Sequence, residues 1–215
     1  MSCATCHDPA QAFTDSHPLA ISMGVSQGVV PGRFGGRNAP TVVYSRYIPI
    51  FGFSEEGPTG GFFHDGRAAS ITAQAGGPPT NAVEMHNPDK ASYVNKVKSS
   101  QYAVDFKRAW GANVFDNADA AYDKIAATVA AFETEDLRFA PFTSKFDYWR
   151  AGKVQLNSDE LDGLSLFNDP GKGNCAACHP STAPNAITPP LFTNFAYDAL
   201  GVPRNTAIPA NADPN

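Results

Sequence analysis

The chain has 215 residues, of which 42% are hydrophobic, so it can bury a core as one large domain or two small ones. Its 18 glycines and 18 prolines indicate that turns and loops form much of the fold. The formal charge of −5 argues against nucleic acid as a partner, and no apolar run is long enough to span a bilayer.

The first element in chain order is a cysteine motif. Cys3 and Cys6 are followed directly by His7, in the sequence CATCH, and the same arrangement returns at residues 175–179 as CAACH. Two cysteines at this spacing lie on one face of a helical turn, where both can form thioethers to one haem. The histidine that follows is then placed to ligate the iron. The pattern therefore predicts two covalently bound c-type haems.

Three other uses of the four cysteines are a shared zinc ion, redox dithiols and a disulfide framework. The zinc interpretation does not explain why a histidine follows each pair, and it requires two distant pairs to converge. A redox dithiol explains one pair better than two. Because covalent haem attachment takes place outside the cytoplasm, the favoured haem interpretation predicts a periplasmic or cell-surface protein.

Residues 8–88 come next and are rich in glycine, proline and asparagine, with little helical periodicity. Stretches such as GVVPGRFGGRNAPTVV are typical of ordered loops. Long loops of this kind are uncommon unless they are functional, so we expect them to wrap around a cofactor. No segment shows the alternation of a strand.

Helices are predicted at residues 89–100, 117–136 and 157–169. The clearest is 117–136, which is rich in alanine, repeats hydrophobic residues on one face, and can be capped by Asn117 or Asp119. The last helix begins with a capping arrangement of Asn157 and Glu160 and leads into the second cysteine motif.

This order of elements predicts a mainly α fold, with two cytochrome c-like haem domains in tandem and long loops. We expect residues 1–140 to form the N-terminal domain and residues 141–215 to form a C-terminal domain that is incomplete. Both ends of the chain are expected to be cuts in a longer protein.

Several blocks of sequence then point to a family. In order along the chain they are SCATCHDPAQAFTD, GRNAP, FFHDGRAASITAQAGGPP, NAVEM, GLSLFNDPGKGNCAACH and YDALGVPRN. This order resembles the bacterial di-haem cytochrome c peroxidases and their MauG-type relatives. The resemblance implies that hydrogen peroxide reacts at the N-terminal haem and that the C-terminal haem passes electrons to it. The haem-binding residues are then Cys3, Cys6 and His7 in the first site and Cys175, Cys178 and His179 in the second.

The resemblance also implies a distal pocket over the first haem. Glu84 in NAVEM and Gln74 in TAQAGGPP match the family's distal glutamate and glutamine, and Pro78 matches a proline of the distal wall. Independently, peroxide cleavage needs a group that takes a proton from one oxygen and returns it to the other, and a carboxylate can do this. The alternative for Glu84 is a solvated loop acid, because most glutamates are exposed.

Further assignments rest on the resemblance with weaker support from chemistry. Asn38 in GRNAP matches a calcium-binding asparagine, with a turn residue as the alternative. His64 stands before DGR, where the family often has a tryptophan between the haems. Arg67 of the same DGR segment can pair with a haem propionate, although both His64 and Arg67 are alternatively structural.

The loop after the first motif departs from the family pattern. Val25 stands where the electron-donor-dependent peroxidases often have a second histidine ligand. His17 is interpreted as a surface residue and Met23 as a packing residue. The first haem is therefore expected to be open on its distal side. The sixth ligand of the second haem is expected beyond the end of this chain.

Together the motifs and the resemblance imply a di-haem c-type peroxidase that reduces hydrogen peroxide, with two haems and a calcium ion as cofactors. Its electrons would come from a small cytochrome c or a cupredoxin. One alternative is a MauG-type enzyme that oxidises a protein substrate. Another is a non-enzymatic di-haem electron-transfer cytochrome. Assembly as a homodimer is left open.

Overall fold

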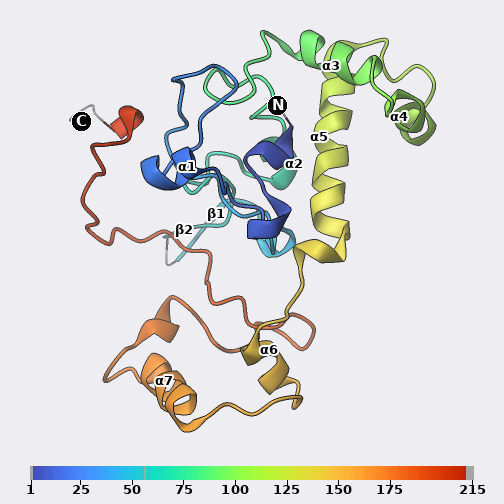
Figure 1. Ribbon diagram of the computed structural model, residues 1–215. Helices are drawn as coiled ribbons and strands as arrows, with labels where there is room; N and C mark the ends of the chain where they lie inside the picture. Colours follow the sequence, from blue (N-terminus) through green and yellow to red (C-terminus); the bar gives the residue numbers. More distant parts are fainter. Residues whose placement is uncertain (1, 56, 212–215) are drawn as a thin grey trace.

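The computed structural model describes residues 2–55 and 57–211 and is mainly helical with long loops, as predicted (Figure 1). Its helices are α1 (Pro18–Met23), α2 (Ile71–Ala75), α3 (Lys90–Lys98), α4 (Ala103–Trp110), α5 (Ala118–Glu135), α6 (Lys145–Arg150) and α7 (Ser158–Asn168). Within the described ranges, no helix combines the length and the apolar character needed to cross a membrane.

The three predicted helices are present, with starts fixed by their caps. The side-chain oxygen of Asn117 accepts a hydrogen bond from the backbone of Ala120 at 2.9 Å, so Asn117 rather than Asp119 caps α5. Asn157 and Glu160 form the predicted capping box of α7. Each cap satisfies backbone N–H groups that have no partner inside the helix.

The sequence pattern missed the short helices α1 and α2 within the predicted loops, the helices α4 and α6, and a small hairpin. The hairpin pairs β1 (Gly52–Ser54) antiparallel to β2 (Gly57–Thr59), with Gly52 opposite Thr59. Strands this short and rich in glycine and proline show no alternation to detect. The helix α4 is only eight residues long and buries only Phe106.

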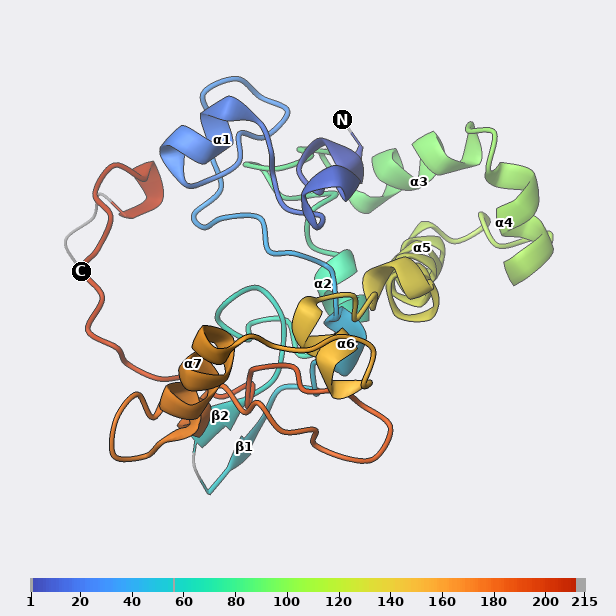
Figure 2. The same cartoon turned by 60° about the horizontal axis from the view of Figure 1, so that its bottom comes forward.

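The longest helix, α5, organises the N-terminal part of the chain. It packs against both α2 and α3, and Figures 1 and 2 both show it beside them. The Tyr122 hydroxyl donates to the carbonyl of Gly76, just after α2, at 2.7 Å. The hydrophobic core here consists of Val94, Phe106, Phe115, Ala121, Tyr122 and Ile125.

A second apolar cluster lies where α5 ends. The Phe139 ring is 2% exposed and packs between Phe13, with ring centroids 4.6 Å apart, and Phe132, at 5.1 Å. The Phe139 carbonyl also accepts a hydrogen bond from the backbone of Tyr44 at 2.6 Å. Phe139 therefore ties the start of the chain to the end of α5.

The helices α6 and α7 gather apart from the α2–α3–α5 assembly, and the chain beyond them runs back to it (Figure 1). The Phe195 carbonyl accepts hydrogen bonds from the Gly60 backbone at 2.9 Å and from the Thr59 hydroxyl at 3.0 Å. The Tyr197 hydroxyl donates to the Gly60 carbonyl at 2.8 Å, and Ile208 is buried. Division of the chain at residue 140 stays a prediction.

Replacing Phe139 with alanine should lower the free energy of unfolding by about 3–5 kcal/mol, because a buried aromatic ring is lost and a cavity remains. Chemical denaturation followed by circular dichroism measures this change. The matched control is Phe53→Ala, since Phe53 is 80% exposed and should change the same quantity by less than about 0.5 kcal/mol. Equal effects of the two substitutions would contradict the packing assigned to Phe139.

Candidate functional site

Both cysteine motifs fold into the same local structure. Each forms one turn of 3₁₀ helix, η1 (Cys3–Thr5) in the first motif and η5 (Cys175–Ala177) in the second. In each, the backbone N–H of the histidine donates to the carbonyl of the first cysteine, at 2.9 Å and 2.8 Å respectively. All four cysteines are free.

Each motif histidine also makes the same side-chain hydrogen bond. Nδ1 of His7 lies 2.9 Å from the carbonyl oxygen of Phe13, and Nδ1 of His179 lies 2.8 Å from that of Phe192. A carbonyl oxygen can only accept, so Nδ1 carries the proton and Nε2 keeps its lone pair. Metal-ligating histidines are normally held in this way by a partner on the other ring nitrogen.

The two phenylalanines that accept these bonds have left-handed backbones, with φ of 60° at Phe13 and 54° at Phe192. For a bulky residue this conformation costs about 1–3 kcal/mol and persists only when the surroundings enforce it. The Phe13 ring packs on Phe139, and the Phe192 ring packs on Phe146 at 5.0 Å and on Phe167 at 5.8 Å. Aromatic packing therefore holds both carbonyls in place.

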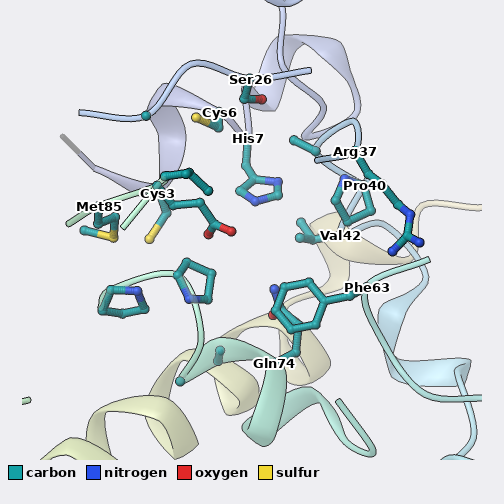
Figure 3. A pocket seen from close by; sticks show the side chains of 18 of the residues that line it. Cys3, Cys6, His7, Ser26, Arg37, Pro40, Val42, Phe63, Gln74 and Met85 are labelled. Carbon is teal, nitrogen blue, oxygen red and sulfur yellow. The ribbon is translucent and has the colours of Figure 1, made fainter. Parts of the chain in front are cut away.

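A cavity of about 500 Å³ lies against the first motif. In Figure 3 the His7 ring projects into it from one side, and Gln74 and Phe63 from the other. Cys3 and Cys6 both lie on its wall. The volume is typical of cofactor pockets, and a thiol pair on one turn beside an imidazole with a free Nε2 suits covalent haem attachment. These residues fit a c-type haem.

The helix α5 forms the apolar wall of the cavity. Tyr122, Ile125, Ala126 and Val129 recur at helical spacing on the face that lines it. Glu133 ends this stripe, one turn further along. Burial raises the pKa of Glu133 to about 7.

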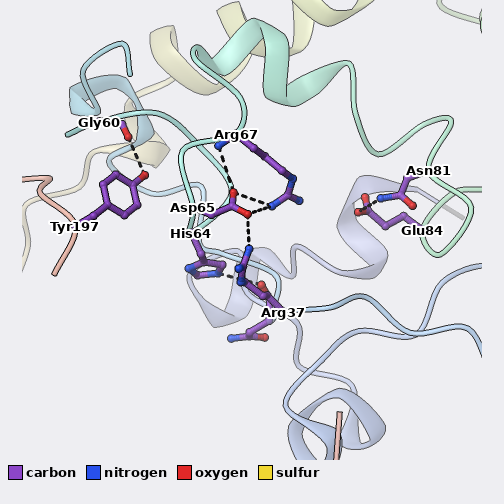
Figure 4. Close-up of polar contacts among 9 residues, drawn as sticks. Arg37, Gly60, His64, Asp65, Arg67, Asn81, Glu84 and Tyr197 are labelled. Atoms are coloured by element: carbon purple, nitrogen blue, oxygen red, sulfur yellow. Dashed lines mark hydrogen bonds and ion pairs between the residues drawn. The ribbon is translucent and has the colours of Figure 1, made fainter. Parts of the chain in front are cut away.

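Glu84, Gln74 and Pro78 also line this cavity, together with the first motif. Burial raises the pKa of Glu84 above its ordinary value, against the opposing effects of Arg67, Asn81 and His7. The Asn81 side-chain amide donates to Oε1 of Glu84 at 2.7 Å (Figure 4). Glu84 is therefore a half-buried, hydrogen-bonded carboxyl rather than a solvated loop acid.

Backbone contacts fix the position of Glu84. Its carbonyl accepts from the Val29 N–H at 2.8 Å, so the loop at residues 26–29 lies directly against it. A side chain on Gly28 would overlap the carbonyl oxygens of Val83 and Glu84. This close approach of two backbones requires glycine at residue 28.

A charged network closes another part of the cavity (Figure 4). Asp65 binds Arg37 at 2.5 Å and Arg67 at 2.9 Å. Although burial alone would raise the pKa of Asp65, the hydrogen bonds from these arginines hold it below its ordinary value. The Arg67 guanidinium also stacks on the Phe63 ring, 3.9 Å from its centroid.

The remaining predicted residues of the first site lie near this network. His64 and Asn38 both line the cavity, and Nε2 of His64 lies 3.1 Å from the Asn38 carbonyl oxygen. By contrast, His17 is exposed and caps α1 by accepting from the Leu19 backbone at 3.2 Å, and neither His17 nor Met23 is among the cavity-lining residues.

The geometry bears on the other uses of the cysteines. Within the part of the chain that the structure describes, no cluster of three or more histidine, cysteine, aspartate or glutamate side chains could hold a metal ion. Burial raises the pKa of both the Cys3 and the Cys6 thiol, whereas reactive dithiols have a lowered pKa. A shared zinc ion and a redox dithiol at the first motif are therefore disfavoured.

The second motif is more open than the first. Cys175, Cys178 and His179 are all exposed, and their nearest apolar surroundings are the Phe192 cluster and the α7 helix. Its turn and its histidine hydrogen bond match those of the first motif.

Sequence reasoning missed three contributors to the first site: Phe13, Asp65 and Glu133. Asp65 lies in the DGR segment, for which the prediction concerned only His64 and Arg67. Glu133 had a detectable signal, because it is an acid that continues the apolar stripe of Ile125 and Val129. The role of Phe13 depends on its backbone conformation, which has no sequence signature for phenylalanine.

Comparisons with known proteins point the same way as the geometry. The model of the family described as di-haem cytochrome c peroxidase matches residues 1–155. The methylamine utilization protein MauG of Paracoccus denitrificans is 36% identical over 206 residues, which cover 95% of this chain and 52% of that protein. Cytochrome c551 peroxidase of Nitrosomonas europaea is 30% identical over 213 residues, or 98% of this chain and 53% of that protein.

A solved structure is similar over the whole chain. The diheme peroxidase BthA from Burkholderia thailandensis matches with a TM-score of 0.90 and 37% identity, covering 100% of this chain and 52% of that one. The chain thus spans about half the length of the relatives that it matches.

The substitution Gly28→Ala should lower the free energy of unfolding by about 1–3 kcal/mol, because the added methyl group forces the backbone at Glu84 to move. Denaturation measured by circular dichroism tests this. Gly163→Ala in α7 is the control, since an added methyl group there has no heavy atom within 4 Å and should be neutral or stabilising. A neutral Gly28→Ala would refute the close approach.

Proposed function

The chain belongs to the di-haem cytochrome c peroxidase family, and on that premise we propose that it forms the haem-binding part of an enzyme that reduces hydrogen peroxide. One observation carries the proposal. A single cavity brings together His7, with its Nε2 free, and the side chains of Gln74 and Glu84. That combination provides an iron ligand and a proton-transfer group in one enclosed space.

Two c-type haems are proposed as cofactors. The first is held through Cys3 and Cys6 with His7 as the iron ligand, and the second through the equivalent residues Cys175, Cys178 and His179. When bound, the haems supply the electron transfer that peroxide reduction needs. The N-terminal haem is proposed as the peroxide site because its motif faces the cavity with Glu84, whereas the second motif is exposed.

Glu84 is proposed to move the proton. Peroxide reduction consumes one peroxide, two protons and two electrons and yields two waters, so a proton must pass between the two oxygens. Asn81 occupies Oε1 of Glu84, which leaves Oε2 to accept the proton and return it to the departing oxygen. Gln74 and Pro78, which line the same cavity, are proposed to orient peroxide and to exclude water.

The charged network is proposed to position the haem. Arg67 carries guanidinium N–H groups beside the cavity and suits a propionate. His64 is proposed as a second polar contact. A calcium ion at Asn38 stays a prediction, because calcium takes about six to eight oxygen ligands and Asn38 offers only its side-chain oxygen while its carbonyl faces His64.

The electron source is proposed to be a small cytochrome c or cupredoxin. The second candidate is a MauG-type reaction, in which a protein substrate is oxidised at its surface. It is favoured by the identity to MauG and by the departure at Val25, which is not a histidine and does not line the cavity. Because c-type haem is attached outside the cytoplasm, we propose a periplasmic location. A homodimer stays a prediction.

A visible spectrum tests the function. The protein purified from a host that attaches haem should carry two covalent haems, with a high-spin component that hydrogen peroxide shifts. Two low-spin haems inert to peroxide would support the electron-transfer cytochrome instead. A colourless protein loaded with zinc would exclude both haem proposals.

The substitution Glu84→Gln should slow the reaction with hydrogen peroxide by about 10²–10⁴-fold, since an amide cannot accept and return the proton. Stopped-flow absorbance measures the rate, and both haems should remain attached. The control is Glu135→Gln, which makes the same change at an exposed position of α5 and should leave the rate unaltered. An unchanged rate in Glu84→Gln would remove Glu84 from the mechanism.

A further inference from the structure

Besides Glu84 and the ion-paired Asp65, the cavity contains a third carboxyl, which the proposed peroxide chemistry does not use. Glu133 lines the cavity from the last turn of α5, in line with the apolar residues Ile125 and Val129. Its negative charge acts on Cys3, where it contributes to the raised pKa of that thiol. Glu133 therefore lies near Cys3, the first attachment residue, whereas Glu84 is held by Asn81.

Among the described residues, no donor forms a hydrogen bond or an ion pair with the Glu133 carboxylate. A half-buried carboxylate without such a partner is costly. Its neighbour Asp136, in contrast, is fully engaged by Arg138. An unpaired acid inside a cofactor cavity is destabilising as an anion, which favours a functional explanation.

Several cations lie on the elements around this region, and three of them pair with other carboxylates. Arg37 and Arg67 bind Asp65 across the cavity, and Arg138 of η4 (Leu137–Phe139) binds Asp136. Arg46 lies on η3 (Ser45–Tyr47), which packs against α5. Burial is the sole cause of the raised pKa of Glu133, so none of these cations stabilises its charged form.

The other titratable groups around the cavity are His7 from the first motif, His64 from the loop before α2, Glu84, Tyr93 of α3 and Tyr122 of α5. Nδ1 of His7 is hydrogen-bonded to the Phe13 carbonyl, and its Nε2 is assigned to iron. The Tyr122 hydroxyl donates to Gly76. Of the two glutamates, Glu84 is held by the Asn81 amide, whereas the Glu133 carboxylate has no hydrogen bond among the described residues.

We propose that Glu133 is a redox-linked proton acceptor of the N-terminal haem site. When the haem iron gains one electron from a one-electron donor, Glu133 takes up one proton from solvent, and when the iron loses that electron, Glu133 releases it. An ionised carboxylate favours the more positive, oxidised iron, so ionisation of Glu133 lowers the midpoint potential. The carboxyl is half-buried and so can still exchange protons with water.

This inference rests on the proposed function, because it requires the haem at Cys3, Cys6 and His7. It makes the midpoint potential of the N-terminal haem fall as pH rises through the range around 7, where Glu133 ionises. A tenfold difference in the proton affinity of Glu133 between the two oxidation states corresponds to a fall of about 59 mV. The midpoint potential of the C-terminal haem, measured in the same titration, serves as an internal reference.

The experiment is a spectroelectrochemical titration of the holoprotein at several pH values on both sides of 7, with mediator dyes as the one-electron donors. The midpoint potential of the N-terminal haem should fall as pH rises across this range in the unaltered protein and in Glu135→Gln. In Glu133→Gln the same potential should not change with pH. In Glu84→Gln the midpoint potential should still fall as pH rises. A fall that persists in Glu133→Gln, or that disappears in Glu84→Gln instead, would overturn the proposal.

A second variant covers the case in which Glu133→Gln fails to attach haem. Glu133→Asp keeps the carboxyl but moves it, so the fall should persist with its inflection at a different pH, and an unchanged inflection would overturn the proposal. The haem spectrum and the reaction with peroxide distinguish a failure of the proposed function from a failure of the role of Glu133. A protein without the N-terminal haem overturns the function as well, whereas a peroxide-reactive protein with a pH-independent potential overturns only the role of Glu133.

Discussion

The arrangement of both motifs depends on one hydrogen bond, from Nδ1 of the motif histidine to a backbone carbonyl. This bond fixes the tautomer and turns Nε2 toward the space where a ligand must sit. In each motif the carbonyl belongs to a phenylalanine in a left-handed conformation that only surrounding rings can maintain. The chemistry of each histidine is thus set by aromatic packing, and in the first motif that packing extends to Phe139 at the end of α5.

The helix α5 therefore serves two purposes. It completes the core around Val94 and Phe106 and also lines the cavity, and Tyr122 and Ile125 take part in both. The loops before α3 line the opposite part of the cavity with apolar side chains such as Val42, Phe63 and Met85. A large apolar cofactor between α5 and these loops would complete a core that neither forms alone.

Much of this could be predicted from the sequence, for reasons that differ between elements. The helices α3, α5 and α7 carry both apolar periodicity and capping residues, so local signals determined them. The cysteine motifs were recognisable because their chemistry requires a fixed spacing. The left-handed backbone of Phe13 and the enclosure of Glu133 depend on contacts between distant segments, and no local pattern carries that information. The hairpin was missed because strands of three residues are defined by their partner alone.

The hydrogen bonds that join Phe195 and Tyr197 to the Thr59–Gly60 segment connect the two parts of the chain a second time. The first connection is the covalent one between α5 and α6. A body attached at one point can swivel, whereas one attached at two points has only a single axis left about which to rotate. The two connections therefore restrict how far the spacing between the two motifs can vary.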